Sequence, residues 1–153
     1  MLHFAYGSNM SRQLMAARCT GAEAIGLATL PGWRFVINAE GFGSIAPSPG
    51  GRVHGVVWRL TPRDLAAVNA YESIDSGLYL RRRLAVRCGE RQVAALVYIA
   101  SQSGEGRARP GYMHLVVEAA REWRLPDSHI RSLARWSSSR WVGARARDTG
   151  EVG

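Results

Sequence analysis

A glutamate, Glu72, falls in line with the apolar face of an expected helix. In a helix that begins at Pro62, the residues Leu65, Val68 and Glu72 follow the spacing i, i+3, i+7 and share one face. A carboxylate that faces a core is unfavourable unless it is paired, hydrogen-bonded or protonated, and burial raises its pKa toward neutrality. Such a group suits general acid–base catalysis. The alternative is that the helix ends near Tyr71 and that Glu72 faces water.

A second candidate lies near the start of the chain, in the segment HFAYGSNM. The apolar residues Phe4 to Tyr6 followed by Gly7, Ser8 and Asn9 predict a strand that runs into a sharp turn. The alternative is an ordinary β-turn with no function. The corner has neither the G-x-G-x-x-G nor the G-x-x-x-x-G-K-S/T pattern, which argues against binding of a nucleotide phosphate.

Other side chains with chemical potential have weaker contexts. His114 and Glu118 stand at i, i+4 on an expected helix, but a third metal ligand at suitable spacing is missing, so we expect a surface pair and no metal site. Ser8 and Ser44 lack the G-x-S-x-G context of a nucleophile. The run from Arg81 to Arg83 is expected to be a solvated strand edge.

Strand patterns dominate the first two thirds of the chain. Stretches rich in β-branched and aromatic residues predict strands at 2–7, 23–30, 33–39, 53–60, 78–88 and 91–100. The last two are expected to form a hairpin around Gly89 and Glu90. Residues 41–52, with their many Gly, Pro and Ser residues, are expected to form a loop with at most one short strand.

Helix signals are fewer and lie mostly late in the chain. A short helix is expected at 11–19, and Thr61, Pro62 and Asp64 form a capping-box pattern for the next one. A third helix is expected to begin near Pro110, with an apolar face made by Leu115, Val116, Ala119, Ala120 and Trp123. After a break at Pro126 and Asp127, a last helix is expected through Ile130, Leu133 and Ala134. This order predicts an α+β fold with a small, mixed, barrel-like sheet and a few packed helices.

Length and composition narrow the function classes. The 153 residues suit one domain, expected at 1–142, with a flexible tail at 143–153. The net charge is +8, but all 20 basic residues are Arg. Because this bias looks like coding composition, we expect no nucleic-acid partner. No apolar stretch approaches the roughly 20 residues of a membrane span, and no secretory signal is visible. Two reduced cysteines and a cytoplasmic location are therefore expected.

Four segments, in order, resemble the γ-glutamylcyclotransferase family. They are FAYGSNM, IAPSPGGRVHGVVWRL, AYESIDSGLY and PGYMHLVVEAAREWRLP. The resemblance implies a barrel-like α+β fold and a small-molecule γ-glutamyl substrate. In the implied reaction the substrate's own α-amine attacks its γ-amide carbonyl, which releases 5-oxoproline and a free amine or amino acid. Neither a metal nor an organic cofactor is implied. We expect a monomer or a homodimer.

The resemblance also implies roles for individual residues. Glu72 takes the place of the family's acid/base, Tyr6, Gly7, Ser8 and Asn9 match its substrate loop, and Tyr79 and Tyr112 match its pocket tyrosines. Backbone N–H groups in the substrate loop are expected to hold a carboxylate or to polarise the γ-carbonyl. Met10 stands where the family commonly has Leu, and Ser73 where Gly is usual. Two alternatives remain open: a cyclotransferase that removes a γ-glutamyl protecting group from an acyl intermediate, and a non-catalytic binding module.

Overall fold

Five strands form a closed barrel in the computed structural model, which describes residues 1–72, 77–102 and 104–147, with side chains as far as residue 137. The order around the barrel is β1-β3-β2-β4-β5. The strands are β1 (Leu2–Ala5), β2 (Glu23–Ile37), β3 (Gly43–Arg59), β4 (Tyr79–Cys88) and β5 (Arg91–Ala100). The predicted α+β class with a barrel-like sheet is confirmed, and so is the β4–β5 hairpin.

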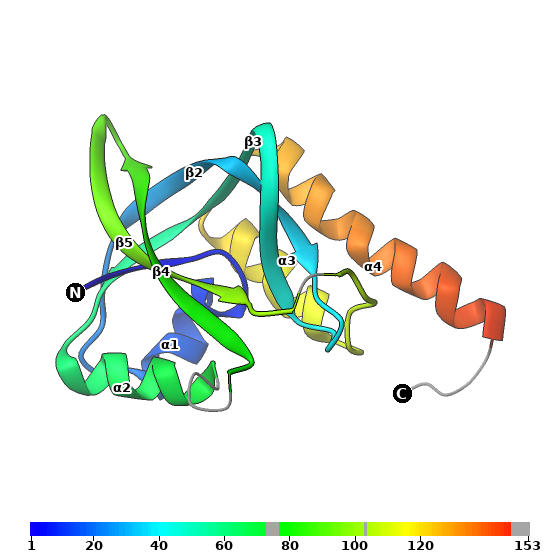
Figure 1. Ribbon diagram of the computed structural model, residues 1–153, viewed down its shortest axis with the longest axis horizontal. Coiled ribbons are helices and arrows are strands. Elements are labelled where there is room, and N and C mark those ends of the chain that lie inside the picture. Colours follow the sequence, from blue (N-terminus) through cyan, green and yellow to red (C-terminus); the bar gives the residue numbers. More distant parts are fainter. Residues whose placement is uncertain (73–76, 103, 148–153) are drawn as a thin grey trace.

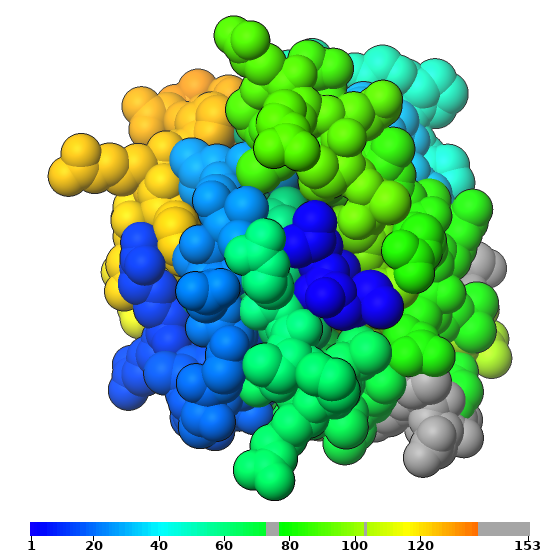
Figure 2. Space-filling view, turned by 90° about the vertical axis from the view of Figure 1, so that its left-hand side faces the viewer, coloured from blue at the N-terminus to red at the C-terminus, as the bar shows by residue number. Residues whose placement is uncertain are grey.

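The first strand closes the barrel. Residues of β1 pair antiparallel with the end of β3, from Leu2 opposite Arg59 to Ala5 opposite Val56. On its other side β1 pairs with β5 in parallel, with His3 opposite Leu96. Figure 2 shows the first residues of the chain, in dark blue, between the teal end of β3 and the green strands. The residues that follow β1 therefore begin at a strand that is paired on both sides.

The predicted break between strands at 23–30 and 33–39 and the predicted loop at 41–52 are wrong. One long strand, β2, passes through Pro31 and Gly32 with a register irregularity, and β3 already begins at Gly43. The two strands form a long antiparallel hairpin in which Trp33 lies opposite Pro47. Pro31 has no N–H to donate, and Gly32 has a positive φ angle. Both residues are tolerated because the pairing of the two strands is irregular at this point.

Helices surround the barrel as Figure 1 shows. A 3₁₀ turn, η1 (Ser8–Met10), and α1 (Arg12–Arg18) follow β1, and α1 and α2 (Pro62–Tyr71) lie together at one end of the barrel. The helix α3 (Tyr112–Glu122) buries Met113, Val116 and Ala120. Its predicted apolar face was wrong at Leu115, which is 46% exposed. The real face is shifted toward Met113 and Val117.

The last helix, α4 (Asp127–Arg147), extends diagonally along the side of the molecule (Figure 1). It packs against α3 and buries Leu133, and Trp136 makes an edge-to-face contact with Phe35 of β2. The expected tail at 143–153 begins within this helix, and residues 148–153 lie outside the described residues. Within the described part of the chain, no helix is both long enough and apolar enough to cross a membrane.

A buried carboxylate fixes the start of α2. Asp64 is 2% exposed and forms the predicted capping box, in which it accepts from the Thr61 N–H while the Thr61 hydroxyl accepts from the Asp64 N–H. It also accepts from the N–H of Gly21, which follows α1. Burial alone would raise the pKa of Asp64, but these hydrogen bonds hold it below its usual value. Asp64 therefore links the start of α2 to the segment after α1.

We expect Asp64→Ala to lower the free energy of unfolding by about 2 kcal/mol, because it removes the cap and leaves the Gly21 N–H without its acceptor. The pKa of Asp64 is lowered by folding, so its contribution is present at neutral pH and is lost as the pH falls through the folded pKa. Urea denaturation at pH 7 and at acid pH measures both effects. The exposed Glu90→Ala is the control; equal stability losses in the two variants would contradict the assignment.

Candidate active site

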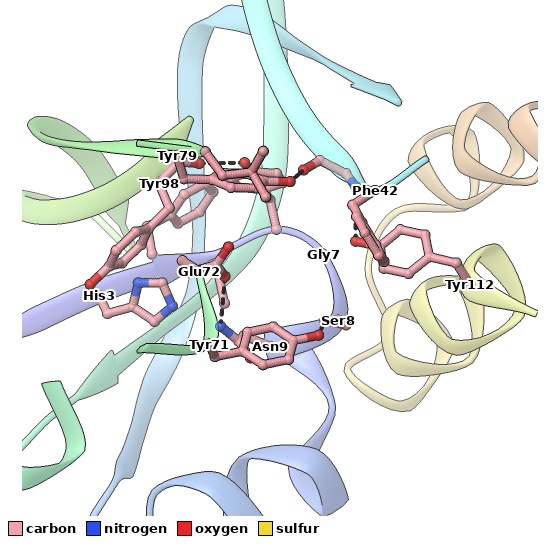
Figure 3. A pocket seen from close by; sticks show the side chains of 15 residues that line it. His3, Gly7, Ser8, Asn9, Phe42, Tyr71, Glu72, Tyr79, Tyr98 and Tyr112 are labelled. Atoms are coloured by element: carbon pink, nitrogen blue, oxygen red, sulfur yellow. Dashed lines mark hydrogen bonds between the residues drawn. The ribbon is translucent and has the colours of Figure 1, made fainter. Parts of the chain in front are cut away.

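A cavity of about 270 Å³ brings the seven predicted site residues together. Tyr6, Gly7, Ser8 and Asn9 come from the segment after β1 and from η1, and Glu72 directly follows α2. Tyr79 is the first residue of β4, and Tyr112 is the first residue of α3. Figure 3 shows Glu72 and Asn9 facing one another, with the rings of Tyr79 and Tyr98 on one side and Tyr112 on another. Segments separated by most of the chain thus form one site.

Glu72 lies immediately beyond the last turn of α2. The helix ends at Tyr71, as the alternative interpretation had it, and Glu72 is its C-cap residue. The second half of that alternative is wrong, because the Glu72 carboxylate lines the cavity and does not project into bulk water. Burial raises the pKa of Glu72 to about 7, against the lowering effect of the Arg18 charge. Near neutral pH this carboxyl group can therefore both accept and donate a proton.

Asn9 connects Glu72 to a cation. The Asn9 side-chain amide donates to Glu72 Oε2 at 3.4 Å, and its carbonyl oxygen accepts from the guanidinium of Arg18. Arg18 also stacks on the ring of Tyr71, with its Cζ 3.4 Å from the ring centroid. Asn9 itself is only 5% exposed. Its side chain is thus fixed between a positive group and the candidate acid/base.

Two tryptophans hold the backbone of the Gly-Ser-Asn corner. Trp58 of β3 donates from its indole Nε1 to the carbonyl oxygen of Asn9 at 3.0 Å, and Trp123 donates to the carbonyl oxygen of Met10 at 2.7 Å. The two indole rings meet edge to face. The corner is therefore a fixed wall of the cavity, because its carbonyl groups are bound from two separate elements.

A close approach explains the glycine in this corner. A Cβ atom on Gly7 would lie 3.0 Å from the hydroxyl oxygen of Tyr112, and one on Gly43 would lie 2.8 Å from the same atom. The Gly43 N–H donates to that hydroxyl at 3.0 Å. Tyr112 is thus seated between two backbones that only glycine allows to come so near. Its own proton remains available to an acceptor in the cavity.

The hydroxyl groups of two other tyrosines are already engaged. Tyr79 donates to the carbonyl oxygen of Gly43 at 2.7 Å and accepts from the Asn38 side chain at 3.1 Å. Tyr6 donates to the carbonyl oxygen of Tyr98. Burial raises the pKa of both tyrosines, so both stay neutral. Their rings line the cavity, but their hydroxyl protons are donated to backbone carbonyl groups.

Sequence reasoning missed several residues that line the same cavity, among them His3, Phe42, Tyr71, Leu78 and Tyr98. His3 is buried, its Nδ1 lies 3.3 Å from the Leu96 carbonyl, and burial lowers its pKa to about 4. Tyr71 could have been found, because it directly precedes Glu72. The others carry no signal in the sequence, since their side chains meet only when the barrel closes.

The weaker candidates of the sequence are not assembled into sites. His114 and Glu118 are exposed, and Glu118 pairs with Arg121. No group of three potential metal ligands forms among the described residues. Ser44 is buried, and its hydroxyl accepts from the Ala100 N–H. The Ser8 hydroxyl lies 3.4 Å from the Tyr71 hydroxyl. Among the described residues, the partners of both serines are therefore groups other than histidine. The run from Arg81 to Arg83 is exposed, as expected.

Comparison with known proteins agrees with this architecture. Residues 3–124 match the family described as "Gamma-glutamyl cyclotransferase, AIG2-like". The gamma-glutamylcyclotransferase of Mus musculus is 24% identical, over 93% of this chain and 81% of its own. That of Homo sapiens is also 24% identical, over 99% of this chain and 86% of its own.

Solved structures share the fold. One described as a gamma-glutamyl cyclotransferase superposes with a TM-score of 0.81 at 24% identity, over 100% of this chain and 93% of its own. YkqA from Bacillus subtilis superposes with a TM-score of 0.77 at 23% identity, over 91% of this chain and 54% of its own. The family match covers most of the chain and includes every residue of the cavity. The chain therefore belongs to the gamma-glutamyl cyclotransferase, AIG2-like family of enzymes.

Proposed function

We propose that this protein cyclises γ-glutamyl compounds to 5-oxoproline, with Glu72 as the acid/base. The observation that carries the proposal is the Glu72 carboxyl group in a cavity that is also lined by five tyrosines and the Gly-Ser-Asn corner, where burial raises its pKa to about 7. The family match and the names of the relatives support the same activity. Ring closure joins two ends of one substrate, so the enzyme contributes mainly by holding the substrate bent and by moving protons.

The proposed steps need one protein group. The Glu72 carboxylate takes a proton from the substrate's α-ammonium group, and the freed amine attacks the γ-carbonyl carbon to give a tetrahedral oxyanion. The protonated Glu72 then gives its proton to the leaving nitrogen as the bond between that nitrogen and the γ-carbon breaks, and the positively charged ring nitrogen loses its second proton to the departing amine, which leaves as an ammonium group. The products are 5-oxoproline and an amine or amino acid, and Glu72 returns to its starting state. A pKa near neutrality suits both transfers.

The remaining residues are proposed to hold the substrate. Tyr112 accepts from Gly43 and has its proton left for an oxygen of the substrate, such as the γ-carbonyl as it becomes an oxyanion. Gly7 and Ser8 line the cavity beside it. Tyr6 and Tyr79 supply ring surface, because their hydroxyl protons are bound by carbonyl groups. Asn9 is proposed to hold the Glu72 carboxylate in addition to contacting the substrate.

We place the reaction in the cytoplasm as part of this proposal. Cys19 and Cys88 are free thiols in the structure, which suits a reducing compartment. The substrate is proposed to be a small γ-glutamyl compound, since a cavity of about 270 Å³ accommodates a head group of amino-acid size.

Glu72→Gln is expected to lower kcat by about 10²-fold or more, because the amide keeps the size of the side chain but cannot shuttle a proton. The assay is release of 5-oxoproline from a panel of γ-glutamyl dipeptides and γ-glutamyl amines. The exposed Glu122→Gln is the matched control and is expected to behave as wild type. Equal activity of Glu72→Gln and wild type would exclude the mechanism. Absence of turnover with every compound would favour a binding module or a protected acyl intermediate as substrate.

The pH dependence is expected to follow Glu72. Below pH of about 7 the group is increasingly protonated and cannot accept the α-ammonium proton, so kcat/KM is expected to fall tenfold for each further pH unit. His3, with its pKa of about 4, titrates well below this range. Initial rates under kcat/KM conditions from pH 4 to 9 provide the measurement. An acidic limb centred at the ordinary pKa of glutamate would contradict the role of burial.

A further inference from the structure

Arg18 lies outside the cavity but contacts two of the groups that surround Glu72. It comes from the last turn of α1, which lies beside α2 at the same end of the barrel (Figure 1). Its guanidinium donates to the side-chain oxygen of Asn9 and covers the ring of Tyr71, with its Cζ 3.4 Å from the ring centroid. Arg18 is half-buried at the end of this helix, and Cys19 is the C-cap residue.

We propose that Arg18 is a positioning residue for Glu72, acting through Asn9 and Tyr71. The inference rests on the proposed function for its catalytic meaning. It assigns to this arginine the task of orienting the acid/base carboxylate and of keeping a positive charge beside it.

The Asn9 amide can face only one way between these neighbours. A guanidinium has donors and no acceptor, so it must meet the Asn9 carbonyl oxygen. The Asn9 NH₂ group is then turned toward Glu72 Oε2, to which it donates at 3.4 Å. Without Arg18 the amide can rotate and present its oxygen to the carboxyl group. That orientation favours the protonated form of Glu72, whereas the observed one favours the ionised form.

The stacking on Tyr71 fixes the end of α2. Tyr71 is the last residue of this helix and is 45% exposed, so little of the core holds its ring in place. Arg18 covers one face of the ring, and Ser8 lies 3.4 Å from the Tyr71 hydroxyl. Because Glu72 is the next residue, holding Tyr71 also restricts where the Glu72 carboxylate can lie.

The charges around Glu72 give Arg18 an electrostatic role. Four tyrosines from other segments interact electrostatically with the Glu72 carboxylate, namely Tyr6, Tyr79, Tyr98 and Tyr112. Burial raises the pKa of each, so they stay neutral at pH 7. His3 of β1 lines the same cavity and is neutral as well, since burial lowers its pKa to about 4. Among the described residues, the positive charge of Arg18 in α1 opposes the effect of burial on the pKa of Glu72. Its removal is therefore expected to favour the protonated form of Glu72.

The test is Arg18→Gln, which removes the charge and the planar fork but keeps a polar side chain. Titration of Glu72 by NMR, in protein carrying ¹³C in the glutamate carboxyl groups, is expected to show its pKa raised by roughly one unit. The acidic limb of kcat/KM is expected to move to higher pH by the same amount. The plateau of kcat above this limb is expected to fall by roughly tenfold, because the carboxylate is less well placed.

Arg12→Gln is the matched control. Arg12 lies on the same helix and also stacks on an aromatic ring, with its Cζ 3.7 Å from the centroid of Trp123, whereas the side-chain hydrogen bonds of Asn9 among the described residues go to Glu72 and Arg18. It is expected to leave the Glu72 titration unchanged. The proposal is overturned if Arg18→Gln titrates and turns over as Arg12→Gln does.

Arg18→Lys keeps the charge but loses the fork and the stacking, and it serves if Arg18→Gln does not fold. It is expected to leave the Glu72 titration close to that of wild type and still to lower the plateau of kcat. Wild-type values for both would overturn the proposal. The NMR titration needs no substrate. If no γ-glutamyl compound is turned over, it still decides whether Arg18 controls Glu72, so failure of the proposed function and failure of this inference are distinguishable.

Discussion

A carboxylate held out of water at the end of a helix is the constraint on which the site depends. Glu72 is only partly exposed and lines the cavity, although α2 ends one residue before it. Burial raises its pKa to about 7 against the lowering effect of the Arg18 charge, and the Asn9 amide donates to its carboxylate. With burial alone the group would favour its protonated form, and with full hydration it would be too weak a base. In the proposed mechanism, the balance between these two effects lets one carboxyl group both accept and donate a proton.

Barrel closure supplies the surroundings that this carboxylate needs. Because β1 lies between β3 and β5, the corner after β1 opens at the mouth of the barrel, where Trp58 and Trp123 bind its carbonyl groups. Tyr79 reaches the same cavity from β4 and Tyr112 from the start of α3. The scaffold thus binds backbone carbonyl groups of the corner and the hydroxyl groups of Tyr6 and Tyr79.

Local patterns in the sequence predicted much of this but not its assembly. The capping box at Thr61, the β4–β5 hairpin and the barrel-like α+β class were readable because propensity, turn chemistry and burial agree there. The long β2–β3 hairpin was not, since its prolines and glycines indicate loops unless a partner strand is known. The spacing of Glu72 predicted burial on the apolar face of a helix, which is only partly right. The helix ends at Tyr71, and the cavity, not the helix face, shields the Glu72 carboxylate from water. The contacts of Arg18 with Asn9 and Tyr71, and of His3 with the Leu96 carbonyl, depend on the tertiary fold, which no local pattern records.

In the proposed reaction the substrate supplies its own nucleophile, and the source of the oxygen atoms in the product tests this most directly. The experiment is turnover of a γ-glutamyl dipeptide in water enriched in ¹⁸O, followed by mass spectrometry of the products. Intramolecular attack by the α-amine predicts 5-oxoproline that contains no ¹⁸O. Glutamate carrying ¹⁸O in its γ-carboxyl group would show attack by water and would contradict the account.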